Sequence, residues 1–464
     1  MDHSVDRVVQ HKRLAALMAQ VGLLAGLAAC GGGSDGDIPL AAAPAPASAS
    51  GPAAPSPSPS PSSSPAPASG SGPSPAPTPT PGPSPAPAPS PGSPAPAPAP
   101  GPSVPAATLP RSFAAVVIDA NGQAGPFALN ASGQVAYSTG SGLASRARFF
   151  DGTTSRDISP EPAMAVAINA NGQVGGQFIS PSGGARAFVW TSATQGLTQV
   201  DSQAGVYTIV EQINATGVAV GTYTRQNFPQ AFRGIPGQPF DPMPSLPVAQ
   251  SGIPMASGLF INAGGTATGF SAVDTTPHVH VALWAPGTGG DVRDLGTLGG
   301  FESRPAALND AGQIAGKADT AASGTHAFLW SDATGMQDLG TLGGRNSAAT
   351  ALNATGTVAG TSDTDVGPRA FRWQAGTMVS LGSLGGGSSA ATTINAAGHV
   401  GGTAQAADGS QHAFLWSPED GMVDLNARVA GTGGPTLQSV IALTDDRTVL
   451  ASSTGGLVLL RPQP

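Results

Sequence analysis

The segment HAFLWSDATGMQDLGTLGGRNSAATALNATG, residues 326–356, contains the motifs that decide the fold. In a β-strand, side chains alternate between the two faces, so Phe328 and Trp330 point to one side. Ala327 and Leu329 then point to the other side. Both faces of such a strand are apolar, and we expect both of them to pack against neighbouring sheets.

The same unit recurs along the chain about every 44 residues. Each copy contains [Ile/Leu]-Asn-x-x-Gly, with its Asn at Asn130, Asn169, Asn214, Asn262, Asn309, Asn353 and Asn395. A degenerate eighth copy begins at Leu443. Around Asn353 the unit holds four short apolar stretches, 348–352, 357–360, 369–373 and 377–381. Four strands in a repeat of this length are typical of β-propeller blades.

The Asn-x-x-Gly element is interpreted as the turn of the first hairpin of each blade. Asn can bond to its own backbone two residues on, and Gly supplies a positive φ. Asn130, Asn214 and Asn353 also match the glycosylation pattern Asn-x-Ser/Thr. Because the turn accounts for all seven copies, we interpret the sequon as coincidence.

A polar column begins the third apolar stretch of each unit and is the candidate binding-face column. Its members are Arg146, Arg186, Gln230, His280, His326, Arg369 and His412. All five tryptophans of the chain stand four residues after a member of this column. Neighbouring blades stack about 10 Å apart, whereas Zn²⁺ needs each nitrogen at about 2.0–2.1 Å. We therefore expect no metal site, and we expect the column to cap strand ends and cover the aromatic stripe.

The motif Asp-Leu-Gly-Thr-Leu-Gly-Gly, at 294–300 and 338–344, is interpreted as a crossover between blades. With His-Ala-Phe-Leu-Trp and Leu-Asn-x-x-Gly, it resembles the HAF family of bacterial extracellular repeat proteins, most strongly over about 255–426. The resemblance implies export and no known activity. No catalytic residue or cofactor is expected, since the sequence lacks Gly-x-Ser-x-Gly and His-Glu-x-x-His motifs.

The two ends of the repeat region are expected to complete one blade. Seven units are whole, and the remainder offers only three strands, 437–442, 448–452 and 457–460. An unfinished blade would leave an open edge, and residues 113–119 can supply the missing outer strand. The expected fold is all-β: a β-propeller of eight four-stranded blades, closed by an N-terminal strand and occupying 111–464.

The region before the repeats has the composition of a disordered Pro-rich linker. Of the 46 prolines, 27 fall in residues 39–110, and no aromatic residue precedes Phe113. Proline fixes φ and removes hydrogen-bond donors, so this stretch is expected to be a polyproline-II stalk. Binding of a Pro-recognising module to the stalk is a weaker alternative.

The first thirty residues resemble a bacterial lipoprotein signal. Arg7, Lys12 and Arg13 precede an apolar run that closes with Leu-Ala-Ala before Cys30. Residues 1–29 would be removed, Cys30 lipidated, and 30–38 left as a flexible tail. Gly31, where an Asp would retain the protein at the inner membrane, favours the outer membrane, on its periplasmic side or at the cell surface.

The net charge of −8 and the absence of a basic stripe argue against nucleic-acid binding. The sequence thus predicts a lipid-anchored envelope protein, expected to be a monomer, whose propeller binds a glycan or protein or serves as a scaffold. Two alternatives remain: an exported carbohydrate-active or other hydrolytic enzyme that uses the loop face, and a purely structural envelope protein. Segments 223–229 and 363–368 are expected on the binding face.

Overall fold

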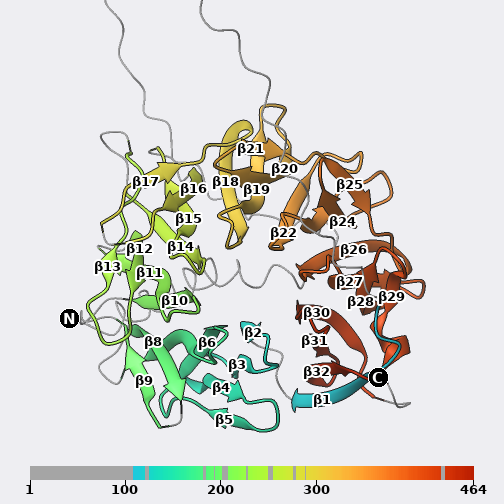
Figure 1. Cartoon of the computed structure of the whole chain (residues 1–464), viewed down its shortest axis with the longest axis horizontal. Coiled ribbons are helices and arrows are strands. Elements are labelled where there is room, and N and C mark those ends of the chain that lie inside the picture. Colours follow the sequence, from blue (N-terminus) through green and yellow to red (C-terminus); the bar gives the residue numbers. More distant parts are fainter. Residues whose placement is uncertain are drawn as a thin grey trace, which may run out of the picture. The chain divides into compact units, whose positions relative to one another are not determined.

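The computed structural model describes residues 108–120, 125–180, 184–192, 194–200, 207–225, 228–248, 254–274, 278–287, 289–429 and 434–464. The predicted signal peptide, Cys30 and residues 31–107 lie outside this part of the chain. Within it, no helix has the length and hydrophobicity needed to cross a membrane. The described strands form eight four-stranded antiparallel sheets arranged as blades in a ring (Figure 1).

Blades 1 to 4 follow one another along the chain. Blade 1 comprises β2 (Phe127–Leu129), β3 (Val135–Thr139), β4 (Arg146–Phe150) and β5 (Ser155–Asp157). Blade 2 comprises β6 (Ala163–Ile168), β7 (Val174–Ile179), β8 (Ala185–Ser192) and β9 (Gly196–Gln199). Blade 3 comprises β10 (Thr208–Ile213), β11 (Ala219–Arg225), β12 (Phe228–Gly234) and β13 (Asp241–Pro242). Blade 4 comprises β14 (Ala256–Ile261), β15 (Ala267–Ala272), β16 (Val279–Trp284) and β17 (Val292–Asp294).

Blades 5 to 8 complete the ring. Blade 5 comprises β18 (Gly299–Leu308), β19 (Ile314–Thr320), β20 (Thr325–Ser331) and β21 (Gly335–Asp338). Blade 6 comprises β22 (Ser347–Leu352), β23 (Val358–Ser362), β24 (Arg369–Gln374) and β25 (Thr377–Ser380). Blade 7 comprises β26 (Gly385–Ile394), β27 (Val400–Ala406), β28 (Gln411–Ser417) and β29 (Gly421–Asp424). Blade 8 comprises β30 (Leu437–Leu443), β31 (Val449–Ser453), β32 (Gly456–Pro462) and β1 (Phe113–Asp119). Two 3-10 turns, η1 (Gly142–Ala144) and η2 (Leu425–Arg428), complete the elements.

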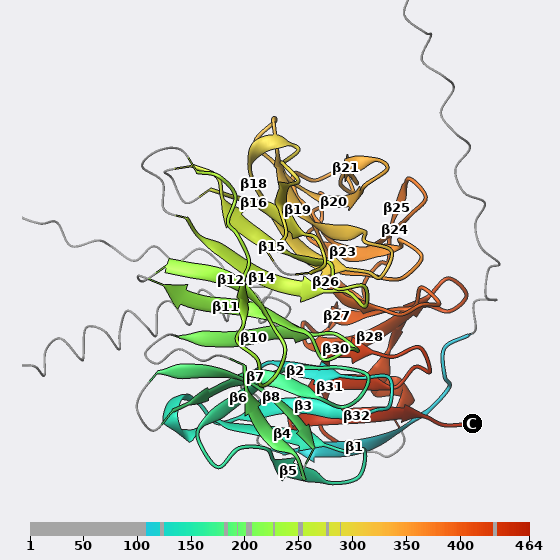
Figure 2. The ribbon, with the colours of Figure 1, turned by 60° about the vertical axis from the view of Figure 1, so that its left-hand side comes forward.

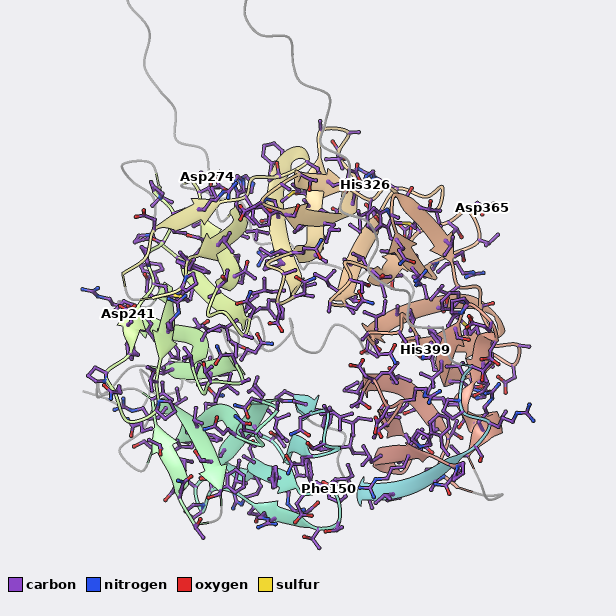
Figure 3. All side chains as sticks on the ribbon, in the orientation of Figure 1. Phe150, Asp241, Asp274, His326, Asp365 and His399 are labelled. Carbon is purple, nitrogen blue, oxygen red and sulfur yellow. The ribbon has the colours of Figure 1, made fainter. Side chains whose placement is uncertain are left out.

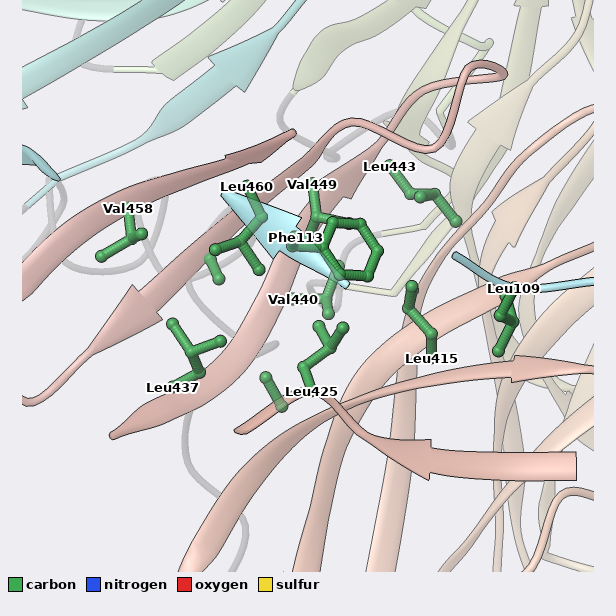
Figure 4. Close-up of a cluster of buried hydrophobic side chains, with 12 residues drawn as sticks. Leu109, Phe113, Leu415, Leu425, Leu437, Val440, Leu443, Val449, Val458 and Leu460 are labelled. Atoms are coloured by element: carbon green, nitrogen blue, oxygen red, sulfur yellow. The ribbon is translucent and has the colours of Figure 1, made fainter. Parts of the chain in front are cut away.

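The predicted closure by the N-terminal strand is confirmed. β1 pairs antiparallel with β32, with Phe113 opposite Pro462 and Val117 opposite Val458. Phe113 is fully buried among Leu425, Val440 and Leu460 (Figure 4). Blade 8 is therefore built from both ends of the domain, and the sheet order is β1-β32-β31-β30.

The alternation in HAFLW produces two separate cores, as the sequence predicts. Phe328 and Trp330 join the core between blades 4 and 5, together with Ile314. Ala327 and Leu329 join the core between blades 5 and 6. Each blade thus packs on both neighbours, and the ring is held by apolar seams between blades.

The Asn-x-x-Gly turns join the first and second strands, as predicted, with every Gly at positive φ. Each Asn Oδ1 accepts a hydrogen bond from the backbone N–H four residues on. Four of them also accept one from the N–H two residues on. The Asn side chains are buried, which agrees with the interpretation of the three sequons as coincidence.

Each Asn has a further bond that the sequence does not reveal: its Nδ2 donates to a backbone carbonyl in the next blade. We call this series the asparagine ladder. The bonds run from Asn130 to Asn169 (3.1 Å), Asn169 to Asn214 (2.9 Å), Asn214 to Asn262 (3.1 Å), Asn262 to Asn309 (3.3 Å), Asn309 to Asn353 (3.0 Å), Asn353 to Asn395 (3.1 Å) and Asn395 to Thr444 (3.3 Å).

The Asp-Leu-Gly-Thr-Leu-Gly-Gly segments are crossovers from an outer strand to the next inner strand, as predicted. At the end of the motif, Gly299 adopts φ +100°. A Cβ on Gly300 would lie only 2.8 Å from the backbone carbon of Asp319, so the chain approaches too closely for a side chain. Ser303 then fixes the crossover, since its hydroxyl donates to Gly296 O at 2.6 Å.

Candidate functional site

The two ends of the ring are built from different connections. The antiparallel order places the Asn-x-x-Gly turns and the turns between third and fourth strands at one end, which we call the turn face. The loops between second and third strands and the crossovers lie at the other end, the loop face. In Figure 2 the C terminus, at the turn face, lies to the right, and the β11–β12 hairpin reaches left toward the loop face. Residues 363–368 and the described ends of 223–229 are on the loop face, as expected.

Three histidines of the predicted column pair with an Asp of the outer strand in their own blade. The bonds from Nδ1 join His280 to Asp294 (2.9 Å), His326 to Asp338 (2.9 Å) and His412 to Asp424 (2.7 Å). Each Asp also accepts a backbone bond from two residues on: Asp294 from Gly296 N at 2.8 Å, Asp338 from Gly340 N at 2.7 Å and Asp424 from Asn426 N at 2.8 Å. Each pair therefore links the third strand to the fourth strand and to the segment that follows it.

In blade 4 the charges of His280 and Asp294 stabilise each other. The hydrogen bond to Asp294 raises the pKa of His280 above its ordinary value, and the Phe301 carbonyl adds to the effect. Burial raises the pKa of Asp294, but the bonds from His280 and Gly296 outweigh burial and hold that pKa below its ordinary value. Each shift favours the charged form of its group.

The other members of the column bond within their surroundings and do not converge on one site. Arg146 donates to Ser145 O at 2.9 Å, and Gln230 donates to Pro229 O at 2.9 Å. Arg369 donates to Pro368 O at 3.1 Å and to Gly387 O. Arg186 is buried. The column is a ring of local contacts, one in each of blades 1 to 7, and Figure 3 shows His326 in the outer part of the ring.

Blade 7 extends its pair into a chain of three groups. The Ser410 hydroxyl lies 3.0 Å from Nε2 of His412, whose Nδ1 lies 2.7 Å from Asp424. This is the connectivity of a hydroxyl nucleophile, a base and an orienting carboxylate. The Ser410 hydroxyl also bonds to Asp408 at 2.5 Å. A hydroxyl has one proton, so donation to Asp408 competes with donation to His412.

An exposed aromatic ring stands on the loop face between blades 4 and 5. Phe301 is 70% exposed and stacks on His278, with ring centroids 5.1 Å apart and an interplanar angle of 19°. His278 is in turn fixed by Asp274 at 2.8 Å. Glu302 and Arg304, 3.5 Å apart, follow Phe301 in sequence. The loop face thus carries an exposed aromatic ring with ionisable groups nearby in the chain.

A buried carboxyl lies on the inner strand β10, at the bulge between Val210 and Gln212. Glu211 Oε1 is buried and has no hydrogen-bond partner among the described residues. Burial raises the pKa of Glu211 to about 7. The nearby Tyr207 has its own pKa raised by burial and by the Glu211 charge. No pattern in the sequence marks this residue, because the other complete units have no acidic residue at the corresponding bulge.

The described chain begins on the turn face and is held there by polar contacts. Asp420 accepts a bond from Leu109 N at 2.7 Å, and Arg428 donates to Pro110 O at 2.7 Å. Arg447, in the turn of blade 8, donates to Thr108 O at 3.0 Å. Leu109 is 3% exposed and belongs to the same core as Phe113. The residues that precede Thr108 are therefore joined to the domain at its turn face.

The sequence analysis did not predict the His–Asp pairs. The signal that could have found them is the Asp that follows the column His by 14, 12 and 12 residues in three units.

Across the described residues, no group of three or more His, Cys, Asp or Glu side chains is arranged to hold a metal ion.

Among known proteins, only solved structures are similar to this chain. The sequence matches no family profile and no curated relative. TolB from Acinetobacter baumannii is similar at 14% identity and a TM-score of 0.34, over 54% of this chain and 62% of that one. A puromycin-hydrolysing peptidase of Mycobacterium tuberculosis is similar at 13% and 0.42, over 75% and 61%. The propeller domain of the Trilobed protease from Pyrococcus furiosus, described as having an open velcro topology, is similar at 11% and 0.43, over 68% and 97%.

This chain therefore spans about three fifths of the TolB and peptidase chains that it matches. At these identities no residue role is carried over from them. The domain in hand is a β-propeller of eight blades closed by its N-terminal strand.

Proposed function

We propose that this protein is a lipid-anchored component of the bacterial outer membrane, on its periplasmic side or at the cell surface, with a propeller that binds a glycan or protein ligand at its loop face. The observation that carries the proposal is the junction at Thr108–Pro110. It joins the preceding chain to the turn face through Asp420, Arg428 and Arg447. The chain thus enters the described domain at the end opposite its loop face.

The composition of the loop face supports a binding role. Loops and crossovers on a rigid scaffold are where binding groups usually stand. Here they carry the stacked ring of Phe301, its neighbours Asp274 and His278, and the histidine pairs. Exposed apolar groups bordered by polar ones are characteristic of interaction sites. The HAF-like repeats, as an exported family, agree with this reading of the chain.

The anchor is tested at the only cysteine. Acyl chains on Cys30 would supply the membrane affinity, so Cys30→Ala should move the protein from the detergent phase to the aqueous phase or leave it unprocessed. Metabolic labelling with a fatty acid should be lost in the same variant. Unchanged partitioning would count against lipidation.

The binding face is tested with matched variants on the two ends of the ring. Phe301→Ser changes an exposed apolar side chain on the loop face, and Ile235→Ser changes one that is 55% exposed on the turn face. The full chain is applied to a glycan array and to envelope-protein extracts. We expect Phe301→Ser, and not Ile235→Ser, to reduce binding. A ligand that binds only at the turn face would contradict the assignment.

Hydrolysis is a second candidate, favoured by the chain Ser410–His412–Asp424. If Ser410 is a nucleophile, a fluorophosphonate probe will label it, and both Ser410→Ala and His412→Ala will abolish the label. If the bond to Asp408 fixes the Ser410 hydroxyl instead, the wild-type chain will remain unlabelled. The recurrence of the His–Asp pair in two blades without a comparable serine contact supports the structural role.

A further inference from the structure

The outer edge of blade 8 differs from the outer edges of all the other blades. The outermost strands of blades 1 to 7 contain two to four residues each. β1, the outermost strand of blade 8, contains seven. Short outer strands protect a sheet from pairing with another chain, and β1 lacks this protection.

The side chains of β1 do not protect its edge either. Its sequence, FAAVVID, has neither a proline nor a charge before Asp119. Ala115 is exposed, and Val117 is 51% exposed. Within the described residues, β1 pairs on its outer side only through the bridge from Phe113 to Val429. The backbone of 114–118 therefore presents an apolar strand edge of the kind that accepts another strand.

We propose that the outer edge of β1, over residues 114–118, pairs antiparallel with the same edge of a second copy of this chain, to form a two-fold symmetric dimer. A two-fold axis makes such an interface self-complementary. The charges at the two ends of the strand agree with this orientation: Arg111 is exposed just before β1, and Asp119 ends it. Antiparallel pairing brings Arg111 of each copy toward Asp119 of the other, whereas parallel pairing would bring like charges together.

The dimer also agrees with the attachment of the chain. A two-fold axis turns one domain over, so the two junctions at Thr108 lie on opposite sides of the pair. The 77 residues between Cys30 and Thr108 can extend on the order of 200 Å. Two anchored copies in one membrane can therefore still pair. This proposed assembly differs from the monomer expected from the sequence, and it does not depend on the proposed ligand or on the anchor.

A cross-link tests the pairing directly, because Cys30 is the only cysteine. In the full chain carrying Cys30→Ala, we introduce Ala115→Cys and Val117→Cys separately and test each variant alone and as a mixture. Antiparallel pairing puts facing Cα atoms about 5 Å apart, within reach of a disulfide. We expect reducible dimers after mild oxidation. Val379→Cys, 40% exposed on the outer strand β25, is the matched control and should remain monomeric.

Sedimentation of the same full chain tests the interface without a cross-link. Val117→Lys sets like charges against each other across the axis and should raise the dimer dissociation constant on the order of tenfold. Val379→Lys should not change it. Folding of each variant is checked by its circular dichroism. A wild-type chain that stays monomeric at about 100 μM would overturn the proposal, and so would cross-linking at 115, at 117 and in their mixture that is in every case no greater than at 379.

Discussion

At the scale of single residues, each ladder Asn has two roles, a local turn and a link to the next blade. Asn309 accepts a bond from Gln313 N at 2.9 Å and donates to Asn353 O at 3.0 Å. Asn309→Asp keeps the acceptor but removes the Nδ2 donor. A carboxylate oxygen then faces the carbonyl oxygen of Asn353, and the two repel each other. We expect it to lower the free energy of unfolding by about 1–3 kcal/mol, measured by chemical denaturation.

Asn309→Ala removes these two bonds and the further bond from Nδ2 to Gln313 Oε1 (2.8 Å), and it serves as the comparison, with an expected loss at least as large. If Asn309→Asp were as stable as the wild type and only Asn309→Ala were destabilised, the turn alone would matter. The ladder would then contribute nothing to stability.

A second prediction at this scale concerns the buried Glu211. The folded pKa of Glu211 is about 7, above the ordinary value of 4.5, because burial favours the protonated carboxyl. The stability that protonated Glu211 provides is therefore full below pH 4.5 and is lost as the pH rises through 7. Glu211→Gln, which cannot ionise, should match the wild type near pH 4. Above pH 8 it should be more stable by about 3 kcal/mol.

Denaturation midpoints measured from pH 4 to 9 give this difference. Glu302→Gln, at a carboxyl on the loop face, is the control and should not show the same rise with pH. A constant difference between Glu211→Gln and the wild type at all pH values would contradict the assignment of a raised pKa.

At the scale of elements, the strand that closes the ring is β1, which completes blade 8. Phe113 is fully buried and is anchored in the sheet opposite Pro462. Phe113→Ala should lower the free energy of unfolding by about 3–5 kcal/mol. Deletion of 111–120 should lower the melting temperature sharply, because it leaves β32 without its outer partner.

Deletion of 40–100, in the Pro-rich segment, is the control for chain shortening and should leave the melting temperature unchanged. A domain lacking 111–120 that melted at the wild-type temperature would show that closure by β1 does not stabilise the ring.

The strands could be predicted from the sequence because their signals are local. The alternation around Phe328 and the spacing of the Asn column fix four strands per unit, and the unpaired remainder at 437–460 points to β1. The contacts between units could not be predicted. The bond from Asn309 to Asn353 and the pair His326–Asp338 depend on how strands are placed side by side, which residue spacing alone does not determine.

At the scale of the whole molecule, the asparagine ladder is open at one seam. Seven Asn side chains link blade 1 through to blade 8, where Thr444 occupies the Asn column. Thr444 accepts the bond from Asn395 but has no amide to donate to blade 1. The seam between blades 8 and 1 is held by its apolar core, which includes Ile118, Tyr137 and Leu457.

This open seam leads to a gain-of-stability prediction. The carbonyl of Asn130 already accepts a bond from Gly133 N, as the carbonyl of Asn169 does from Gly172 N while it also receives the Nδ2 of Asn130. A carbonyl has two lone pairs, so Asn130 O can accept one more donor. Thr444→Asn should supply that donor, complete the ladder and raise the free energy of unfolding by about 1 kcal/mol.

Thr444→Ser, which keeps a hydroxyl and adds no amide, is the control and should give no gain in chemical denaturation. If Thr444→Asn and Thr444→Ser were equally stable, blade 8 would not present its first turn to blade 1 as the other blades present theirs, and the ring would be closed by β1 and its apolar core alone.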